Sequence, residues 1–175
     1  MKMKMKMKKL IALLLAAVLL ICFCGCSSDE TETESESNPP MLGDAEAPTP
    51  SEGLAYSVVE NEIWITGIGS CTDTDLVIPD RIDGKPVTKI EVDAFHGNEN
   101  ITSVYIPDTV QDIGQGAFYL CKNLTSVTFA RPTAWTTILP GTPGSTIPAN
   151  QMANPSRAAE LFTTGASAIG NWVRD

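Results

Sequence analysis

Apolar and polar positions repeat along residues 101–129 at a fixed interval, the distance from Ile101 to Leu124. Residues 101–123 read ITSVYIPDTVQDIGQGAFYLCKN, and residues 124–129 begin the same unit again with LTSVTF. Four apolar positions also recur one interval earlier, so that the pattern occupies Val87, Ile90, Ala94 and Phe95 and again Val110, Ile113, Ala117 and Phe118. A fixed interval of this length is typical of a solenoid, in which each repeat buries its apolar face against its neighbours.

Each repeat is expected to add one short strand to a parallel sheet. The apolar residues of LTSVTF are predicted to face the core, while Ser126 and Thr128 face outward, because side chains alternate along a strand. Pro79 and Pro107 are expected to end their strands, since proline cannot donate a hydrogen bond to a neighbouring strand. The coils are expected within residues 76–130.

The first repeat is longer than the second. Five extra residues precede Val87, and they include the turn-forming pair Asp83 and Gly84. We therefore expect a longer loop on the outside of the coil.

Such an array needs a cap at each end. Residues 53–75 are expected to form the N-terminal cap, a β-hairpin that turns at Glu60 and Asn61. The predicted fold is thus α+β and mainly β: a short solenoid of stacked parallel strands between this hairpin and a helix-containing C-terminal cap.

The C-terminal cap is expected within residues 131–175. A helix of about ten residues is predicted to begin at Asn154 and Pro155 and to end at Gly165, from the usual residue preferences of helix ends. Trp172 and Val173 are expected to return as a strand or extended tail over the final coil.

Residues 1–25 follow the plan of a secretory signal peptide. Five lysines precede an apolar run over residues 10–21, and a run of about 12 residues is too short to span a hydrocarbon core. The cysteines that follow resemble a bacterial lipobox, in which a cysteine receives a lipid and becomes the new N-terminus. Cys26 fits this role best, while Cys22, Cys24 and cleavage as a plain signal peptide stay open. We expect an extracytoplasmic protein held to the membrane by this lipid alone.

Residues 26–52 are expected to be the lipidated cysteine and a disordered acidic tether. Ser27–Glu52 hold eight acidic residues and four prolines and very little that could be buried. Removal of the signal peptide leaves seven basic residues against 21 acidic ones, and residues 53–175 keep a net charge of −6. An acidic surface repels phosphates, so we expect no nucleic acid partner.

The repeats resemble the BspA-like class of bacterial leucine-rich repeats. The second repeat supplies nearly the whole motif: Ile101, Val104, Ile106, Pro107, Val110, Ile113, Gly114, Ala117, Phe118 and Cys121. The first repeat departs from it at Glu91 and Asn98. Residues 75–90 are similar to a frequent opening unit, and Trp135 to Trp172 look like a module that closes such arrays. This resemblance implies a leucine-rich-repeat surface lipoprotein, in a class with some members implicated in adhesion.

The sequence offers little for chemistry. His96 is the only histidine and is expected on a surface loop, and Cys121 is expected to face the core. Cys71, in a polar loop, is the only candidate for thiol reactivity, and a disulfide with Cys121 stays open. Asp73 and Asp75 lack the rest of a calcium loop. We therefore expect no cofactor, no metal and no enzymatic activity.

The outward positions of the predicted strands are the candidate binding face: Val77, Ser103, Tyr105, Ser126 and Thr128. We expect a monomeric interaction module that binds a protein or a glycan. The alternative is an envelope component that acts on the cell's own wall, which the tether favours because about 26 residues reach at most roughly 90 Å.

Overall fold

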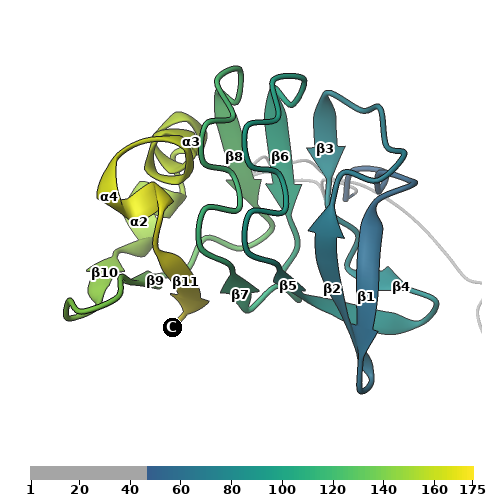
Figure 1. Cartoon of the computed structure of the whole chain (residues 1–175), viewed down its shortest axis with the longest axis horizontal. Coiled ribbons are helices and arrows are strands. Elements are labelled where there is room, and N and C mark those ends of the chain that lie inside the picture. The colour runs from purple at the N-terminus through teal and green to yellow at the C-terminus, as the bar shows by residue number, and fades with distance from the viewer. Residues whose placement is uncertain (1–46) are drawn as a thin grey trace, which may run out of the picture. The chain divides into compact units, whose positions relative to one another are not determined.

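The computed structural model describes residues 47–175, which fold into two sheets and a C-terminal group of short helices (Figure 1). The predicted signal peptide, Cys26 and most of the predicted tether lie outside the described residues. The predicted mainly β solenoid with a hairpin cap and a helix-containing cap is confirmed.

The smaller sheet contains the strands that the repeat predicted. β3 (Asp75–Val77), β6 (Ser103–Ile106) and β8 (Ser126–Phe129) are parallel and lie side by side in that order. Ser103 pairs with Ser126 and Tyr105 with Thr128, so equivalent residues of successive repeats lie in rows across the strands. The inward positions are buried apolar residues, as the alternation predicted: Leu76, Val104, Ile106, Val127 and Phe129.

The larger sheet shows that the expectation of one strand per repeat was wrong. Each coil also forms a second strand, β5 (Lys85–Ile90) in the first and β7 (Asp112–Ile113) in the second. The sheet order is β1-β2-β5-β7-β11-β9-β10, so this sheet joins the two coils to both caps. β7 was missed because it is only two residues long, and alternation cannot show in so short a segment. β5 was missed because its buried residues, Val87 and Ile90, are three positions apart and do not alternate.

The five extra residues of the first repeat form a hairpin and not the loop that we expected. β4 (Arg81–Ile82) pairs antiparallel with the start of β5. Asp83 and Gly84 make the turn with φ values of 52° and 76°. Two successive positive φ values suit a two-residue hairpin turn, because its twist matches that of the strands.

The N-terminal cap is the predicted hairpin. β1 (Ala55–Val59) pairs antiparallel with β2 (Glu62–Gly67), and β2 pairs parallel with β5. The folded part begins before the expected boundary at residue 53, because Ser51 is buried and its backbone N–H donates to the Val77 carbonyl at 2.9 Å. The Ser51 hydroxyl accepts from the Val77 N–H at 3.0 Å, so this segment continues the edge of β3.

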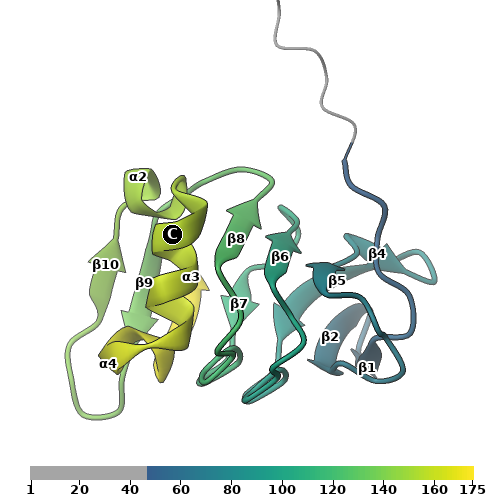
Figure 2. The ribbon, with the colours of Figure 1, turned by 90° about the horizontal axis from the view of Figure 1, so that it is seen from above.

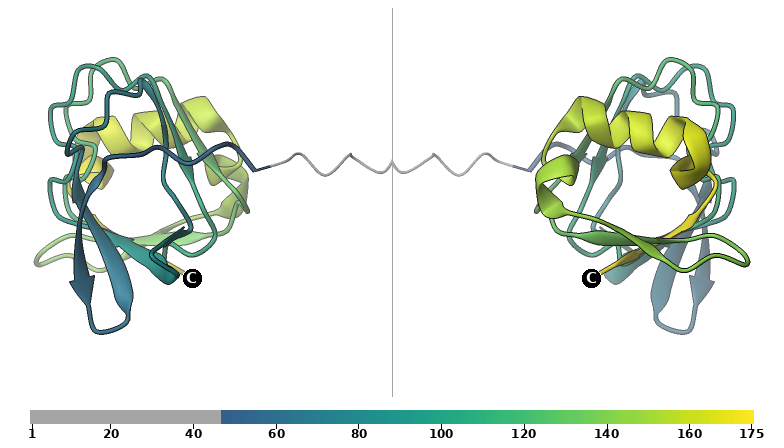
Figure 3. Two further views of the ribbon diagram at one scale, coloured as in Figure 1. Left: turned by 90° about the vertical axis from the view of Figure 1, so that its right-hand side faces the viewer. Right: turned by 90° about the vertical axis from the view of Figure 1, so that its left-hand side faces the viewer.

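The C-terminal cap combines strands with helices. β9 (Trp135–Ile138) and β10 (Ser145–Ile147) pair antiparallel and lead into α2 (Ala149–Met152). α3 (Pro155–Thr163) begins as predicted, with the Asn154 side chain accepting from the Arg157 N–H. α4 (Gly165–Ala168) follows α3. The end-on views place α3 across one end of the coils and the N-terminal hairpin of β1 and β2 at the other end (Figure 3).

β11 (Asn171–Arg174) is the returning strand that Trp172 and Val173 predicted. It lies between β7 and β9 and pairs antiparallel with both. Trp172 is buried, and its ring centre lies 4.4 Å from that of Phe162 in α3. The last residues therefore hold the cap against the final coil.

The core runs through both coils into the cap. Phe118 stacks on Phe95 of the preceding repeat at 5.1 Å between ring centres and meets Phe162 edge to face at 5.8 Å. Gly114 lies where the backbones of the two coils come close together, because a Cβ there would clash with the Val92 backbone. The first repeat has Glu91 at the matching position.

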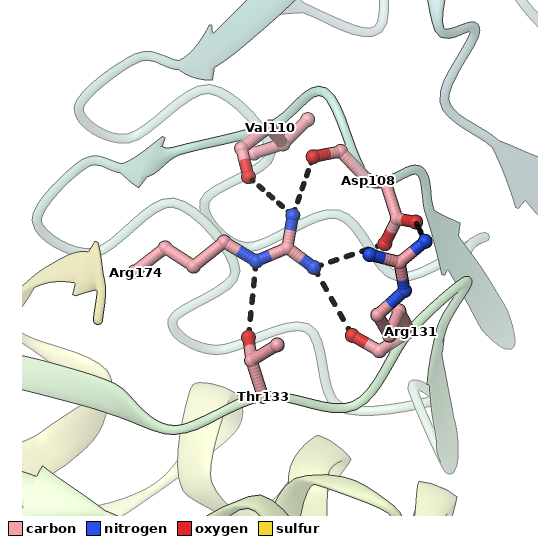
Figure 4. A network of polar contacts seen from close by, with 5 residues as sticks. All are labelled: Asp108, Val110, Arg131, Thr133 and Arg174. Atoms are coloured by element: carbon pink, nitrogen blue, oxygen red, sulfur yellow. Dashed lines mark hydrogen bonds and ion pairs between the residues drawn. The ribbon is translucent and has the colours of Figure 1, made fainter.

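Arg174 fastens the last strand to the final coil (Figure 4). Its guanidinium donates to both the carboxylate and the backbone carbonyl of Asp108, the former at 3.0 Å. It also donates to the Arg131 carbonyl at 3.0 Å and to the Thr133 hydroxyl at 3.0 Å. The Arg174 side chain is only 10% exposed. Arg131 pairs with the same carboxylate at 3.3 Å, but its side chain is 76% exposed.

Replacing Arg174 with methionine is expected to lower the free energy of unfolding by about 2 kcal/mol, because charged hydrogen bonds to carbonyl groups are lost. Arg131→Met is the matched control and should cost less than about 0.5 kcal/mol, since an exposed ion pair contributes little. Urea unfolding followed by circular dichroism measures both values. Equal losses in the two variants would contradict the role assigned to Arg174.

Candidate binding surface

The outer face of β3, β6 and β8 carries all five residues that the sequence proposed for binding. Val77, Tyr105 and Thr128 form one row across the three strands, and Ser103 and Ser126 belong to a second row. Thr128 is exposed, and the other four are half-buried. The structure thus brings these residues together on one surface, which we call the small-sheet face. Figure 2 shows two of its strands, β6 and β8, side by side.

Asp75 completes the second row and was missed as part of this face. It lies beside Ser103 in register, and its carboxylate accepts from the Ser103 hydroxyl at 2.6 Å and from the Thr102 hydroxyl at 3.1 Å. These hydrogen bonds, with Ser103 first, lower the pKa of Asp75. Asp75 lies two positions before Val77 on the same strand, so the alternation that placed Val77 on this face also places Asp75 there.

The two ends of the small-sheet face differ. Ser51 extends the β3 edge at one end, while α3 packs against β8 at the other. Beyond the strands, Lys122 pairs with Glu99 at 2.8 Å and the Asn123 amide donates to the Glu99 carbonyl at 2.6 Å. These contacts join the loops of successive coils, so the rim of the face is held by polar interactions.

His96 lies on an exposed loop, as predicted. Its ring Nδ1 lies 3.1 Å from the Asp93 carboxylate, and its ring meets the edge of Tyr119 at 5.6 Å between centres. Within residues 47–175, no three side chains of His, Cys, Asp and Glu gather in a way that could hold a metal ion. His96 and Tyr119 occupy the same position of successive repeats, and their contact stacks the loops.

The two cysteines of the folded part are both free thiols. Cys121 is buried, and its Sγ donates to the Phe95 carbonyl at 3.0 Å, whereas Cys71 is half-buried. Burial raises the pKa of Cys121 to about 11. Because folding favours the protonated thiol, this contribution to stability is present below pH 9 and is lost as the pH rises towards 11.

Iodoacetamide at pH 8 is expected to label Cys71 much faster than Cys121 in the folded chain, because the thiolate is the reactive form and Cys121 is buried with a raised pKa. Peptide mass spectrometry measures the two rates separately. Unfolding in urea should bring the rates together, and a rapid reaction of Cys121 in the folded chain would contradict the buried thiol.

No helix in residues 47–175 has the length and apolar character needed to cross a membrane.

The small-sheet face is made of the outward-pointing residues of β3, β6 and β8. It contains hydroxyl groups, one carboxylate, one aromatic ring and one aliphatic side chain.

Three solved bacterial structures are similar to this chain. A leucine-rich repeat protein of T. pallidum is 32% identical over 45% of this chain and 37% of its own, with a TM-score of 0.42. A leucine rich cell surface protein of Faecalibacterium prausnitzii is 30% identical over 48% and 24%, with a TM-score of 0.43. A leucine-rich repeat protein of Bacteroides capillosus is 25% identical over 50% and 68%, with a TM-score of 0.42. The chain thus spans less than half the length of the first two, and no curated protein matches.

A family model also matches, and its description is "BspA type Leucine rich repeat region (6 copies)". The match covers residues 71–139, from the loop before β3 to the end of β9. Repeats of this family are typically non-enzymatic scaffolds for interactions. Together with the stacked strands and the regular interval between repeats, the match shows that residues 71–139 are a BspA-type leucine-rich repeat region.

Proposed function

We propose that this chain is an interaction module that binds a partner protein through the small-sheet face. The observation that carries the proposal is the alignment of Val77, Tyr105 and Thr128 in one row on a sheet that is fixed at both ends. Rigid strands present side chains with little loss of conformational entropy on binding. Tyr105 supplies the kind of half-buried aromatic ring that interfaces favour.

The charge of the module supports a partner with basic groups at its rim. Residues 53–175 carry a net charge of −6, and Asp75 lies at the edge of the small-sheet face. Opposite charge on a partner raises the rate of encounter and favours the correct orientation. A glycan remains the alternative ligand, because Ser103, Ser126 and Thr128 offer hydroxyl groups.

We further propose that the module is displayed outside the cell from a lipid on Cys26 and serves in adhesion. The lysine-rich start, the apolar run over residues 10–21 and the cysteine that follows support this location. The second candidate is an envelope component that acts on the cell's own wall. The tether favours it, because a reach of at most roughly 90 Å would keep the module inside a thick wall.

The test compares two ligand sets for the purified full chain. Biolayer interferometry against purified host matrix proteins and against purified peptidoglycan should show saturable binding to one set. The double variant Tyr105→Ala, Thr128→Arg should lower that affinity by about tenfold or more, as expected when an aromatic contact is lost and a charge is added.

A matched control places the same changes elsewhere. Tyr56→Ala with Thr66→Arg alters exposed residues of β1 and β2 and should leave binding unchanged. Binding to matrix proteins supports adhesion, and binding to peptidoglycan alone supports the wall-directed function. Equal binding by both double variants and the unchanged chain would refute the small-sheet face as the site.

A further inference from the structure

A shallow groove of about 290 Å³ lies on the outer face of the larger sheet, over β2, β5 and β7. This is a different surface from the small-sheet face, because none of its strands belongs to the smaller sheet. We call it the large-sheet groove, and it is lined by Glu62, Trp64, Thr88, Lys89, Gln111 and Asp112. Its size is close to the lower limit for small-molecule pockets.

Strand register brings these side chains together. Trp64 pairs with Lys89, and Lys89 pairs with Asp112, so the three form a row across β2, β5 and β7. The register of β5 against β2 shifts at this row, which places Thr88 as an extra residue between the buried Val87 and the row. A bulge of this kind re-aims side chains and often lies beside a binding site.

The polar groups of the groove are only partly satisfied. The Thr88 hydroxyl donates to the Glu62 carboxylate at 2.7 Å, and the Lys89 ammonium lies 4.5 Å from the centre of the Trp64 ring. One carboxylate oxygen of Asp112 is buried and has no hydrogen-bond partner in the structure. This oxygen is shielded by the protein, so a ligand in the groove reaches Asp112 only through the rest of its carboxylate.

Partial burial of Asp112 changes the pKa of its carboxyl group. Desolvation raises the pKa of this carboxyl, while the nearby Lys89 and a hydrogen bond with Asn171 oppose the rise. The carboxyl is thus partly desolvated, and it lies near both Lys89 and Asn171.

Trp64 differs from the other two tryptophans of the chain. Trp135 and Trp172 are buried in the C-terminal cap, with 0% and 1% exposure, and they belong to the core. Trp64 is half-buried and lines the groove instead. An indole in this position offers an apolar surface beside several hydrogen-bonding groups, which is the combination that a ligand with both apolar and hydroxyl faces requires.

We propose that the large-sheet groove binds a sugar ring of a neutral saccharide. The lining carries both signs of charge, since Glu62 and Asp112 lie beside the Lys89 ammonium, so a charged ligand would meet a like charge as well as an opposite one. A neutral polyhydroxyl ligand uses groups of both kinds. Its hydroxyls donate to Asp112 and Glu62 and accept from Lys89 and Gln111, while its C–H face packs against the exposed part of Trp64.

This inference does not depend on the protein-binding function proposed for the small-sheet face. The two surfaces share no residue, so variants of one leave the other intact. Tyr105→Ala should therefore leave saccharide binding unchanged, and Trp64→Ala should leave protein binding unchanged.

The test titrates the purified full chain with four neutral oligosaccharides: chitotriose, cellotriose, maltotriose and mannotriose. Isothermal calorimetry measures affinity, and tryptophan fluorescence reports on Trp64, because the other two tryptophans are buried. At least one of the four should bind saturably with a dissociation constant in the micromolar to low millimolar range. A heparin disaccharide and a triarginine peptide, as anionic and cationic probes, should not bind at the groove.

Three variants locate the binding. Trp64→Ala and Asp112→Asn should each weaken binding by about tenfold or more, and Tyr56→Ala, which alters an exposed ring outside the groove, should not. Thermal unfolding checks that each variant is folded, and Asp112→Asn decides the question if Trp64→Ala is not. The proposal is overturned if no neutral oligosaccharide binds, if a charged probe binds at the groove instead, or if the folded groove variants bind as tightly as the unchanged chain.

Discussion

Removing residues 172–175 is expected to abolish cooperative thermal unfolding of the domain. The deletion takes away most of β11, which lies between β7 and β9 and pairs with both. It also removes Trp172 from the core beside Phe162, and the Arg174 contacts to the turn at Asp108. A solenoid of two coils depends on its caps, because the last coil otherwise exposes its apolar face.

Differential scanning calorimetry and hydrogen exchange measure this effect in the truncated chain. Deletion of Asp175 alone is the control, since this exposed residue makes two hydrogen bonds, from the Thr136 hydroxyl at 2.7 Å and to the Ala134 carbonyl at 3.2 Å. It should lower the melting temperature by only a few degrees, as expected for a stability change of about 1 kcal/mol or less. A cooperative transition near the original temperature in the chain that ends at Asn171 would refute the role of β11 as an essential cap.

Replacing Phe118 with alanine is expected to lower the free energy of unfolding by about 3–5 kcal/mol, the usual loss for a large core aromatic. Phe118 is fully buried and contacts both Phe95 of the preceding coil and Phe162 of α3. It therefore connects the repeat, its neighbour and the C-terminal cap. A small domain has a total stability of about 5–15 kcal/mol, so this loss is a large part of the whole.

Chemical denaturation followed by tryptophan fluorescence measures the change, since Trp172 packs on Phe162 beside this cluster. Val92→Ala is the matched control, because Val92 is 53% exposed and its truncation should cost less than about 0.5 kcal/mol. The loss of unfolding free energy for Phe118→Leu should lie between the losses for Phe118→Ala and Val92→Ala. A loss below about 1 kcal/mol for Phe118→Ala would show that the coils and the cap do not share one core.

The two proposals place one binding surface on each of the two sheets of the domain. The small-sheet face is made of residues that recur in each repeat, so adding coils would lengthen it. The large-sheet groove is made where the hairpin cap meets the coils, because Glu62 and Trp64 come from β2. The groove therefore depends on the cap, and its ligand can differ from that of the repeated face.

The candidate binding face could be predicted from the sequence because it follows from local alternation. Once residues 124–129 were recognised as a strand, Ser126 and Thr128 had to point away from Val127 and Phe129. The large-sheet groove could not be predicted in this way. Trp64, Lys89 and Asp112 lie far apart in the sequence, and only the pairing of their strands places them in one row.

The sequence by itself determined the solenoid, its hairpin and helical caps, and the inward residues, because these depend on the spacing of apolar positions and on the residues at helix ends. Only the tertiary structure decided that each coil has a second strand, that Ser51 continues the edge of β3, and that β11 lies between β7 and β9. These features rest on hydrogen bonds between backbone groups distant in sequence. Since every residue carries the same backbone groups, side-chain patterns do not specify which of them pair.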